Sequence, residues 1–396
     1  MHSSINDCVF SGGCHKLIVN NFKKDCNLSR SIGVLFLRGI IMPALNECFT
    51  HKYAMMKKIK RLSVLLSMVM ALMIISCVQA QDVIDQVSEK YNNITAVEVE
   101  GSFCSVSIIG GTGSDVDFKG EVLGSKKYDI KIRHNVSGGT LRVWIDRPNS
   151  LRNVKGKLEF TVPANTNIDV DNSSGSISVE NIGQVVVALK ASSGSVRARN
   201  IDSNLTAEAS SGSIALADIK GDVRAVTSSG SQKHNNIGGN LKAKASSGSL
   251  KVEGVGGEAE LGTSSGSQSI NVIGNNLYTK SSSGSIKISD VTGDVKASAT
   301  SGGIGLSKIT GAVNLSTSSG SQRGTNMKLT GNSTFKSSSG SVSMELSNDA
   351  EELSFALTAS SGSLSAKGSS GRKNLVIERG PIKITGVSSS GSQTYR

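Results

Sequence analysis

The tripeptide Ser-Gly-Ser returns along this chain at a nearly fixed interval, and between Gly194 and Gly320 each step is 18 residues. A short fixed period is typical of a solenoid, in which each repeat is one coil and only stacked coils bury a core. We therefore predict an all-β fold, a single-stranded parallel β-solenoid (β-helix) with 18 residues per coil and the right-handed sense that parallel crossover connections prefer. The corner glycines of its regular part are Gly194, Gly212, Gly230, Gly248, Gly266, Gly284 and Gly320.

One repeat, residues 284–301, shows the plan of the coil. Ile286 and Ile288 alternate with polar residues, a Thr-Gly pair follows as a turn signal, and Val295 and Ala297 alternate again. This pattern predicts two short strands and two turns per coil. Glycine at the corner permits a positive φ or a close approach of neighbouring coils, and we expect the flanking serines to form a ladder of hydroxyl groups.

Less regular segments flank this array. Residues 94–171 alternate apolar and polar residues in strand-length runs without the fixed step, which predicts an irregular β region that caps the first coil. Residues 81–93 are expected to form a linker or a short helix, and the solenoid takes in residues 172–396. After Gly320 the steps lengthen, and the extra residues are expected to form loops, with candidates at residues 348–352 and 373–381.

The last corner, residues 390–396, begins a coil and stops. An uncovered strand edge presents unpaired backbone groups. This C-terminal edge is therefore a candidate for self-association with another copy of the chain.

Residues 55–80 have the order of a secretory signal peptide: a basic stretch, an apolar run from Leu62 to Ile75, and small residues at a cleavage site. Cleavage before Gln81 would release a soluble exported protein, whereas a lipobox-like sequence ending at Cys77 would leave that cysteine lipidated. Both alternatives stay open. Residues 1–54 then precede the signal peptide and are interpreted as an over-extended start outside the mature protein. We expect export to the periplasm, outer membrane or cell surface of a Gram-negative bacterium.

The formal charge of +12 is unevenly distributed. Residues 1–77 hold ten Lys/Arg and three Asp/Glu, and residues 78–396 hold 33 Lys/Arg and 28 Asp/Glu. Because the lysines of the second part alternate with apolar residues, we interpret them as a solvated face and not as a nucleic-acid-binding stripe. Cys104 is the one cysteine after residue 77, so it has no disulfide partner there and is interpreted as a small residue of a strand.

A second rhythm overlies the first at the residue two positions after the corner glycine. This residue alternates between an apolar side chain, as in Ile214 and Leu250, and glutamine. The glutamines are Gln232, Gln268, Gln322 and Gln393. If the slot faces inward, their amides must be hydrogen-bonded in the core. Duplication of a two-coil unit explains the rhythm but not the choice of glutamine.

No catalytic set, cofactor motif or metal-ligand spacing stands out in the sequence. Serine is abundant because every corner supplies it. His134 and His234 belong to no catalytic frame, and His234 falls in a core slot of the repeat. Asp222 and Asp294 share one turn slot, where a carboxylate column could bind calcium or serve a lyase. Since other coils place Asn or Glu in that slot, turn chemistry is the better interpretation.

Residues 157–164 end a strand in Val-Pro, the strand Ile168-Asp169-Val170 follows, and Ser174-Gly175-Ser176-Ile177 opens the repeats. Over residues 94–396 this order resembles the bacterial putative adhesin family, envelope proteins built from a domain of unknown function. The resemblance implies a parallel β-solenoid in the cell envelope and brings no catalytic residues. The glutamine-bearing coils depart from the family pattern, in which Ile or Val follows each corner.

We therefore expect a non-enzymatic cell-envelope or surface protein, an adhesin or ligand-binding solenoid whose flank binds a surface glycan or protein. Two alternatives stay open. A polysaccharide-active β-helix enzyme would gather acidic and basic residues in one groove, and a self-assembling structural scaffold would join chains through the C-terminal edge. No cofactor and no nucleic acid is expected as a partner, and a membrane is expected only through a lipid anchor at Cys77.

Overall fold

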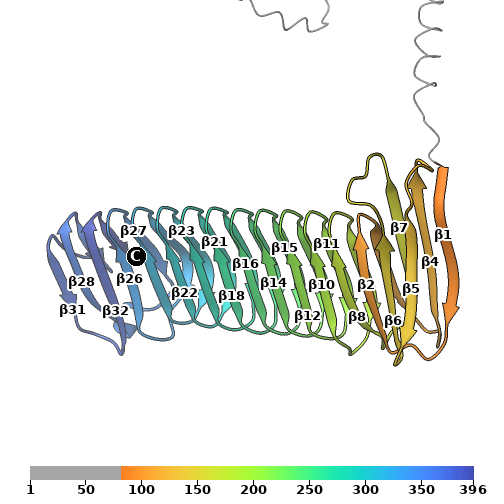
Figure 1. Cartoon of the computed structure of the whole chain (residues 1–396). Coiled ribbons are helices and arrows are strands. Elements are labelled where there is room, and N and C mark those ends of the chain that lie inside the picture. Colours follow the sequence, from red (N-terminus) through yellow and green to blue (C-terminus); the bar gives the residue numbers. More distant parts are fainter. Residues whose placement is uncertain (1–81) are drawn as a thin grey trace, which may run out of the picture. The chain divides into compact units, whose positions relative to one another are not determined.

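The computed structural model describes residues 82–396, which form two long β-sheets that face each other (Figure 1). We call the 17-stranded sheet, which begins with Asp82–Tyr91, sheet A and the 16-stranded sheet sheet B. Each coil runs through a strand of sheet B, a Ser-Gly-Ser corner, a strand of sheet A and a second turn. The predicted all-β parallel solenoid is therefore confirmed, with two strands per coil. The predicted signal peptide, the lipidation of Cys77 and the over-extended start at residues 1–54 lie outside the described residues.

Sheet A holds 17 strands. In spatial order they are β1 (Asp82–Tyr91), β4 (Val116–Gly124), β7 (Lys155–Pro163), β3 (Ser105–Gly111), β9 (Ile177–Ile182), β11 (Val196–Ile201), β13 (Ile214–Ile219), β15 (Gln232–Ile237), β17 (Leu250–Val255), β19 (Gln268–Ile273), β21 (Ile286–Thr292), β23 (Ile304–Thr310), β25 (Gln322–Lys328), β27 (Val342–Leu346), β33 (Gln393–Tyr395), β29 (Leu364–Ala366) and β30 (Ser369–Gly371).

Sheet B holds 16 strands. In spatial order they are β5 (Lys131–Ser137), β6 (Thr140–Asp146), β2 (Ala96–Ser102), β8 (Asn167–Asn172), β10 (Val187–Ala191), β12 (Leu205–Ala209), β14 (Val223–Thr227), β16 (Leu241–Ala245), β18 (Ala259–Thr263), β20 (Leu277–Ser281), β22 (Val295–Ala299), β24 (Val313–Thr317), β26 (Ser333–Ser337), β32 (Ile382–Ser390), β28 (Leu353–Ser361) and β31 (Asn374–Ile377).

The core is a single narrow layer between the two sheets. In β13, Ile214, Leu216 and Ile219 are at most 1% exposed, and in β14 Val223 and Ala225 are at most 3% exposed. Successive coils repeat this arrangement in register, so the buried side chains form columns along the stack. Burying each Val, Leu or Ile side chain of these columns stabilises the fold by about 1.5–3 kcal/mol relative to leaving it exposed.

The corner glycines are required by the close approach of neighbouring coils. A Cβ atom on Gly212 would lie 1.8 Å from the carbonyl oxygen of Gly194, and one on Gly248 would lie 1.9 Å from that of Gly230. Of the two roles expected for these glycines, close approach is therefore the one that the regular array uses. A positive φ occurs only at the later corners Gly362 and Gly391 among the corner glycines of the described residues.

The corner serines are joined mainly through their backbones. The N–H group of Ser211 donates to the carbonyl oxygen of Ser192 at 2.8 Å, and the same bond recurs from corner to corner. Within residues 82–396, one pair of corner hydroxyls is hydrogen-bonded, Ser363 to Ser392 at 3.0 Å. The expected ladder of hydroxyls is therefore wrong for most corners, because the backbone groups of adjacent coils already satisfy one another.

Near the end of each regular sheet-A strand, six positions after the corner glycine, one residue adopts the left-handed conformation. Asn and Asp fill most of these positions, as their tolerance of positive φ predicts. The residues with φ between 51° and 82° in this column are Asn181, Asn200, Asp218, Asn236, Gly254, Val272, Asp290, Lys308 and Asn326. Val272, with φ of 57°, is the β-branched exception.

At the N-terminal end, strands β2 to β8 lie between Ala96 and Asn172. The expected linker or short helix at residues 81–93 is wrong, because Asp82–Tyr91 is strand β1, antiparallel to β4. Ile84, Val87 and Tyr91 pack partly against the core, which fixes the segment as a strand. The coil of β2 and β3 lies out of chain order, between β6 and β7 on one side and β8 and β9 on the other.

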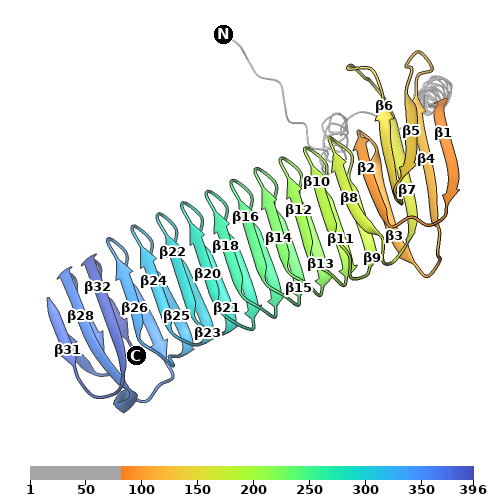
Figure 2. The same ribbon diagram turned by 60° about the horizontal axis from the view of Figure 1, so that its bottom comes forward.

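The C-terminal end also contains a coil out of chain order (Figure 2). Strand β32 lies between β26 and β28, and β33 lies between β27 and β29. The predicted open edge at residues 390–396 is therefore wrong, because this tail is inserted between two earlier segments. The outermost strands are β31 and β30, antiparallel to their neighbours. Of the two expected loops, residues 348–352 contain the 3₁₀ turn η1 (Ala350–Glu352), and residues 373–381 contain β31.

Candidate ligand-binding surface

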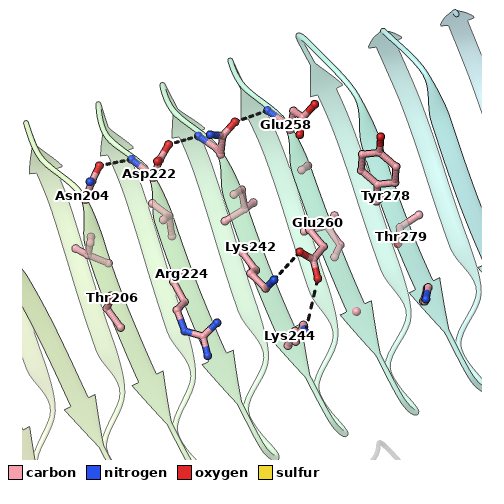
Figure 3. Close-up of a pocket in the computed structure, with 18 of the residues that line it drawn as sticks. Asn204, Thr206, Asp222, Arg224, Lys242, Lys244, Glu258, Glu260, Tyr278 and Thr279 are labelled. Atoms are coloured by element: carbon pink, nitrogen blue, oxygen red, sulfur yellow. Dashed lines mark hydrogen bonds and ion pairs between the residues drawn. The ribbon is translucent and has the colours of Figure 1, made fainter.

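The outer face of sheet B is hollowed into a groove of about 2020 Å³ that crosses the strands from β10 to β26 (Figure 3). Its floor consists of the outward side chains of these strands. The second turns, with Asn204, Asp222 and Glu258, line it at one end of the strands. The outer face of sheet A has a much smaller depression of about 230 Å³ between β9 and β15.

A ladder of side chain to backbone hydrogen bonds holds these turns together. The side-chain oxygen of Asn204 accepts from the N–H group of Asp222 at 2.8 Å, and that of Asp222 accepts from Asn240 at 2.7 Å. Asp294 accepts in the same way from Ala312 at 2.9 Å. The interpretation of Asp222 and Asp294 as turn residues is confirmed. Among residues 82–396, no group of three His, Cys, Asp or Glu side chains is arranged to hold a metal ion.

From β16 to β26 each strand sends two side chains into the groove, so the floor consists of two rows that cross the strands. The first row, from β14 to β26, is Arg224, Lys242, Glu260, Tyr278, Lys296, Asn314 and Thr334. The second row, from β16 to β26, is Lys244, Gly262, Lys280, Ser298, Ser316 and Lys336.

The two rows differ in the length of their side chains, and this difference hollows the face. In the second row, Gly262, Ser298 and Ser316 are short and separate three lysines. A Cβ atom on Gly262 would meet nothing closer than Lys244 Cγ at 3.8 Å, so the floor there is open. The first row is made mostly of long side chains, and its Tyr278 is 44% exposed.

The floor is positively charged, with six cations and one carboxylate in the two rows. Lys242 Nζ lies 2.6 Å from one oxygen of Glu260, and Lys244 Nζ lies 3.6 Å from the other (Figure 3). The hydrogen bond from Lys242 is the main reason that the pKa of Glu260 lies below its usual range. This carboxylate is therefore ionised near neutral pH and has no proton to donate as a general acid.

The remaining cations of the floor are free of carboxylates. No ion pair joins Arg224, Lys280, Lys296 or Lys336 to another residue of the chain between residues 82 and 396. Their charges are available to a ligand. The outer face of sheet A also carries cations, among them Arg197 and Arg199 of β11, Lys233 of β15, Lys251 of β17, Lys287 of β21 and Arg323 of β25. The groove, and not the number of charges, distinguishes sheet B.

The N-terminal end of the same face is acidic. Glu98 and Glu100 of β2 lie beside Asp169 and Asp171 of β8. Burial raises the pKa of Asp169 first, and the neighbouring charges of Glu98 and Asp171 raise it further. The face of sheet B thus changes sign along the stack, from carboxylates near β2 to cations from β14 onward.

The four glutamines face the core and are hydrogen-bonded there, as burial requires. The Nε2 group of Gln232 donates to the Thr227 hydroxyl at 3.0 Å and to the carbonyl oxygen of Lys244 at 2.7 Å, which joins the two sheets across the coil. Gln268 and Gln322 repeat both bonds with the Thr and Lys of their own coils, and Gln393 bonds to Ser388 and to the carbonyl oxygen of Thr358. These amides act inside the fold and do not line the groove.

The other singled-out residues also lie away from the groove. His234 is fully buried, with Nε2 2.9 Å from Gln232 Oε1, and desolvation lowers its pKa to about 4. His134 lies on β5, with Nδ1 2.6 Å from the Tyr91 hydroxyl. Cys104 is buried at the turn between β2 and β3 rather than in a strand, and burial raises its thiol pKa to about 12. It is therefore an unreactive packing residue.

The fold and this surface define a class of protein: a two-sheet parallel β-solenoid with a closing cap of antiparallel strands at each end and a long groove on one outer face. The chain belongs to the Toastrack DUF4097 family, which matches residues 94–270 and 257–396. The family resemblance inferred from the sequence is thereby confirmed. No helix within residues 82–396 has the length and apolar character needed to cross a membrane.

Among solved structures, the chain is similar to a putative cell adhesion protein from Clostridium sporogenes ATCC 15579, with 9% identity and a TM-score of 0.22 over 78% of this chain and 98% of that one. It is also similar to a putative adhesin from Bacteroides fragilis NCTC 9343, with 12% identity and a TM-score of 0.22 over 79% and 97% of the two chains. No curated protein matches the chain.

Proposed function

We propose that this chain is a non-enzymatic, exported protein of the bacterial cell envelope that binds an extended surface glycan along the sheet-B groove. The observation that carries the proposal is the groove itself, which is open, lined by polar and charged side chains, and crosses every sheet-B strand from β10 to β26. A long open groove suits a linear ligand better than a small molecule, which proteins usually enclose in a concave pocket.

The chemistry of the groove supports a binding role over catalysis. The single carboxylate of its floor, Glu260, is ionised and held by two lysines. The groups whose pKa values are most perturbed, among them His234 and Cys104, lie in the core and do not reach the groove. A polysaccharide-active enzyme would need an acid and a base that both face the ligand. The other carboxylates that line the groove lie in its turns, where Asp222 and Glu258 accept hydrogen bonds from Asn240 and Asn276 and Asp202 is paired with Lys220.

The proposal includes export through the signal peptide expected at residues 55–80, to the periplasm, the outer membrane or the surface of a Gram-negative cell. Mass spectrometry of the mature N-terminus tests this part. An N-terminus at Gln81 supports release after cleavage, a lipidated Cys77 supports membrane tethering, and an unprocessed chain in the cytoplasm contradicts export.

Binding is tested with a glycan array and a variant that fills the groove. Gly262→Phe places a large side chain on the open floor, whereas Gly305→Phe places it on the outer face of sheet A, where an added Cβ meets nothing within 4 Å. We expect the groove variant to lose glycan binding and the Gly305 variant to keep it. Failure of the unmodified protein to bind any glycan, or equal binding by both variants, would contradict the proposal.

A further inference from the structure

We infer that the ligand of the sheet-B groove is an acidic polysaccharide, a linear chain that carries carboxylate or sulfate groups at intervals and lies across the strands over β14 to β26. This inference rests on the proposed function and adds the chemical class of the ligand. It is carried by the charge of the floor, by the spacing of its side chains and by the acidic surface at one end of the face.

The free cations are spread along the groove instead of being gathered at one point. Arg224 lies on β14, Lys280 and Lys296 lie on β20 and β22, and Lys336 lies on β26. Parallel neighbours in a sheet are about 4.8 Å apart, so the six strand steps from Arg224 to Lys336 extend over about 29 Å. A single small anion cannot contact all of these cations, but an extended polyanion can.

Between the cations lie groups that can hydrogen-bond sugar hydroxyls. Ser298 and Ser316 separate Lys280 from Lys336 in one row, and Asn314 follows Lys296 in the other. Charged and neutral polar groups thus alternate along the floor. An acidic polysaccharide presents the same alternation, because its anionic groups are separated by hydroxyl-bearing rings.

The aromatic content of the groove favours a sugar chain over a single-stranded nucleic acid. Proteins that bind single strands without sequence preference stack successive bases on several aromatic side chains. Among the residues that line the groove, Tyr278 is the one aromatic side chain. It supplies a single platform for a sugar ring, between Glu260 and Lys296 in the same row.

The acidic end of the face sets a boundary for such a ligand. Glu98, Glu100, Asp169 and Asp171 lie on β2 and β8, outside the stretch that carries the free cations. Arg142 pairs with Glu100 and Lys190 pairs with Asp171, so among residues 82–396 Glu98 and Asp169 are the two of these carboxylates without an ion pair, and their charges repel a polyanion. The pKa of Asp169 is raised first by burial and then by the charges of Glu98 and Asp171. The bound chain is therefore expected to stop short of β8.

The test compares two forms of one polymer, polygalacturonate and its highly methyl-esterified form, which share a backbone and differ in charge. Binding to the purified full-length protein is measured by calorimetry at several salt concentrations. We expect polygalacturonate to bind more tightly by about tenfold or more, with an affinity that falls as salt rises.

Two matched triple variants locate the contact. Lys280→Gln/Lys296→Gln/Lys336→Gln removes three free cations from the groove, and Lys233→Gln/Lys287→Gln/Arg323→Gln removes three from the outer face of sheet A. We expect the groove triple to weaken polygalacturonate binding about tenfold and to reduce its salt dependence, and the sheet-A triple to change the affinity by less than about twofold. Circular dichroism of both variants checks that the fold is kept.

Each contrary outcome overturns a different statement. Equal weakening by both triples would mean a general attraction to a basic stack and would overturn the assignment to the groove. Equal binding of the esterified polymer, abolished by Gly262→Phe, would overturn the acidic ligand but leave glycan binding in the groove intact. Tighter binding of an oligothymidylate through the same lysines would overturn the polysaccharide in favour of a nucleic acid. No binding of any polymer would overturn both proposals.

Discussion

The ring of Tyr395 lies 5.6 Å, centroid to centroid, from the ring of Phe355, a residue that precedes it in the chain but follows it in the stack. Phe335 lies at the same distance on the other side, and Tyr395 is 1% exposed. The coil of β32 and β33 therefore fills a space between two coils that formed from earlier sequence. The ring of Tyr395 packs against both Phe335 and Phe355 and so connects this coil to the coils on either side.

Replacement of Tyr395 should weaken the C-terminal end of the stack. Tyr395→Ala is expected to cost about 3–5 kcal/mol of unfolding free energy, because it leaves a cavity between Phe335 and Phe355. Tyr395→Phe keeps the ring and loses the hydrogen bond from its hydroxyl to Gln393, which should cost only about 1 kcal/mol. Urea denaturation measures both values. Similar stability of the Ala and Phe variants would contradict the packing role.

Corner glycines should tolerate no side chain. Gly248→Ala is expected to lower the unfolding free energy by about 3 kcal/mol or more, because the new methyl group meets the carbonyl of Gly230 and the backbone must shift. The control is Gly305→Ala on the outer face of β23, where the methyl group meets open space and should stabilise the strand by about 0.5–1 kcal/mol. Thermal or urea unfolding measures the stability of both variants. A Gly248→Ala variant as stable as the control would refute the close approach.

Val272 should be a site at which stability can be gained. Its φ of 57° is strained for a β-branched residue, and its side chain is 50% exposed, so little burial is lost on replacement. Val272→Asn is expected to stabilise the protein by about 1 kcal/mol, as measured by the urea midpoint. The reverse change at the equivalent position, Asn236→Val, should destabilise by a similar amount. A destabilised Val272→Asn variant would argue against strain at this column.

The glutamine coils should depend on their threonine partners. Gln322 Nε2 donates to Thr317 Oγ1 at 3.1 Å, whereas the preceding coil has Ile304 and Ala299 in these two slots. Thr317→Ala and Gln322→Ile each leave a polar group in the core without its hydrogen-bond partner. The double variant restores the apolar pair. A double-mutant cycle is expected to give a coupling energy of about 1 kcal/mol. Strict additivity would mean that the hydrogen bond contributes nothing.

His234 should make stability depend on pH between about 6.5 and 4. Burial lowers its pKa to about 4 in the folded protein, against the usual 6.5 in the unfolded chain. The unfolded chain then binds more protons in this window, so stability rises with pH and is lost as pH falls. Below pH 4, the loss of unfolding free energy caused by His234 should approach about 3 kcal/mol relative to neutral pH. Urea unfolding across this range should show a flatter profile for His234→Leu. An unchanged profile would contradict the depressed pKa.

The repeated part of the fold could be predicted because its determinants are local. A glycine that must avoid a carbonyl, such as Gly248, recurs in every coil, and the alternation of Ile286 and Ile288 reports which side chains face inward. The coils out of chain order could not be predicted. Strand β32 has the same alternating pattern as other strands, and its place between β26 and β28 depends on packing of Tyr395 with residues far away in the sequence.

The groove was missed because cations occupy outward slots on both sheets, and the sequence does not say which face is hollow. That depends on short residues such as Gly262 and Ser298 lying beside lysines of neighbouring strands. The role of the glutamines, in contrast, had a signal in the sequence. Threonine stands five residues before Gln232, Gln268 and Gln322, while the apolar coils mostly carry alanine there.

Because the register of the array is uniform, the number of repeats sets the length of the outer face of sheet B. From β11 to β23 each strand meets its neighbour at the residue one repeat away, while the two ends are closed by strands of their own. Gain or loss of one repeat would lengthen or shorten the face of sheet B by one strand spacing, about 4.8 Å, without altering either closure. The length of the outer face of sheet B is therefore adjustable in single steps by duplication within the gene.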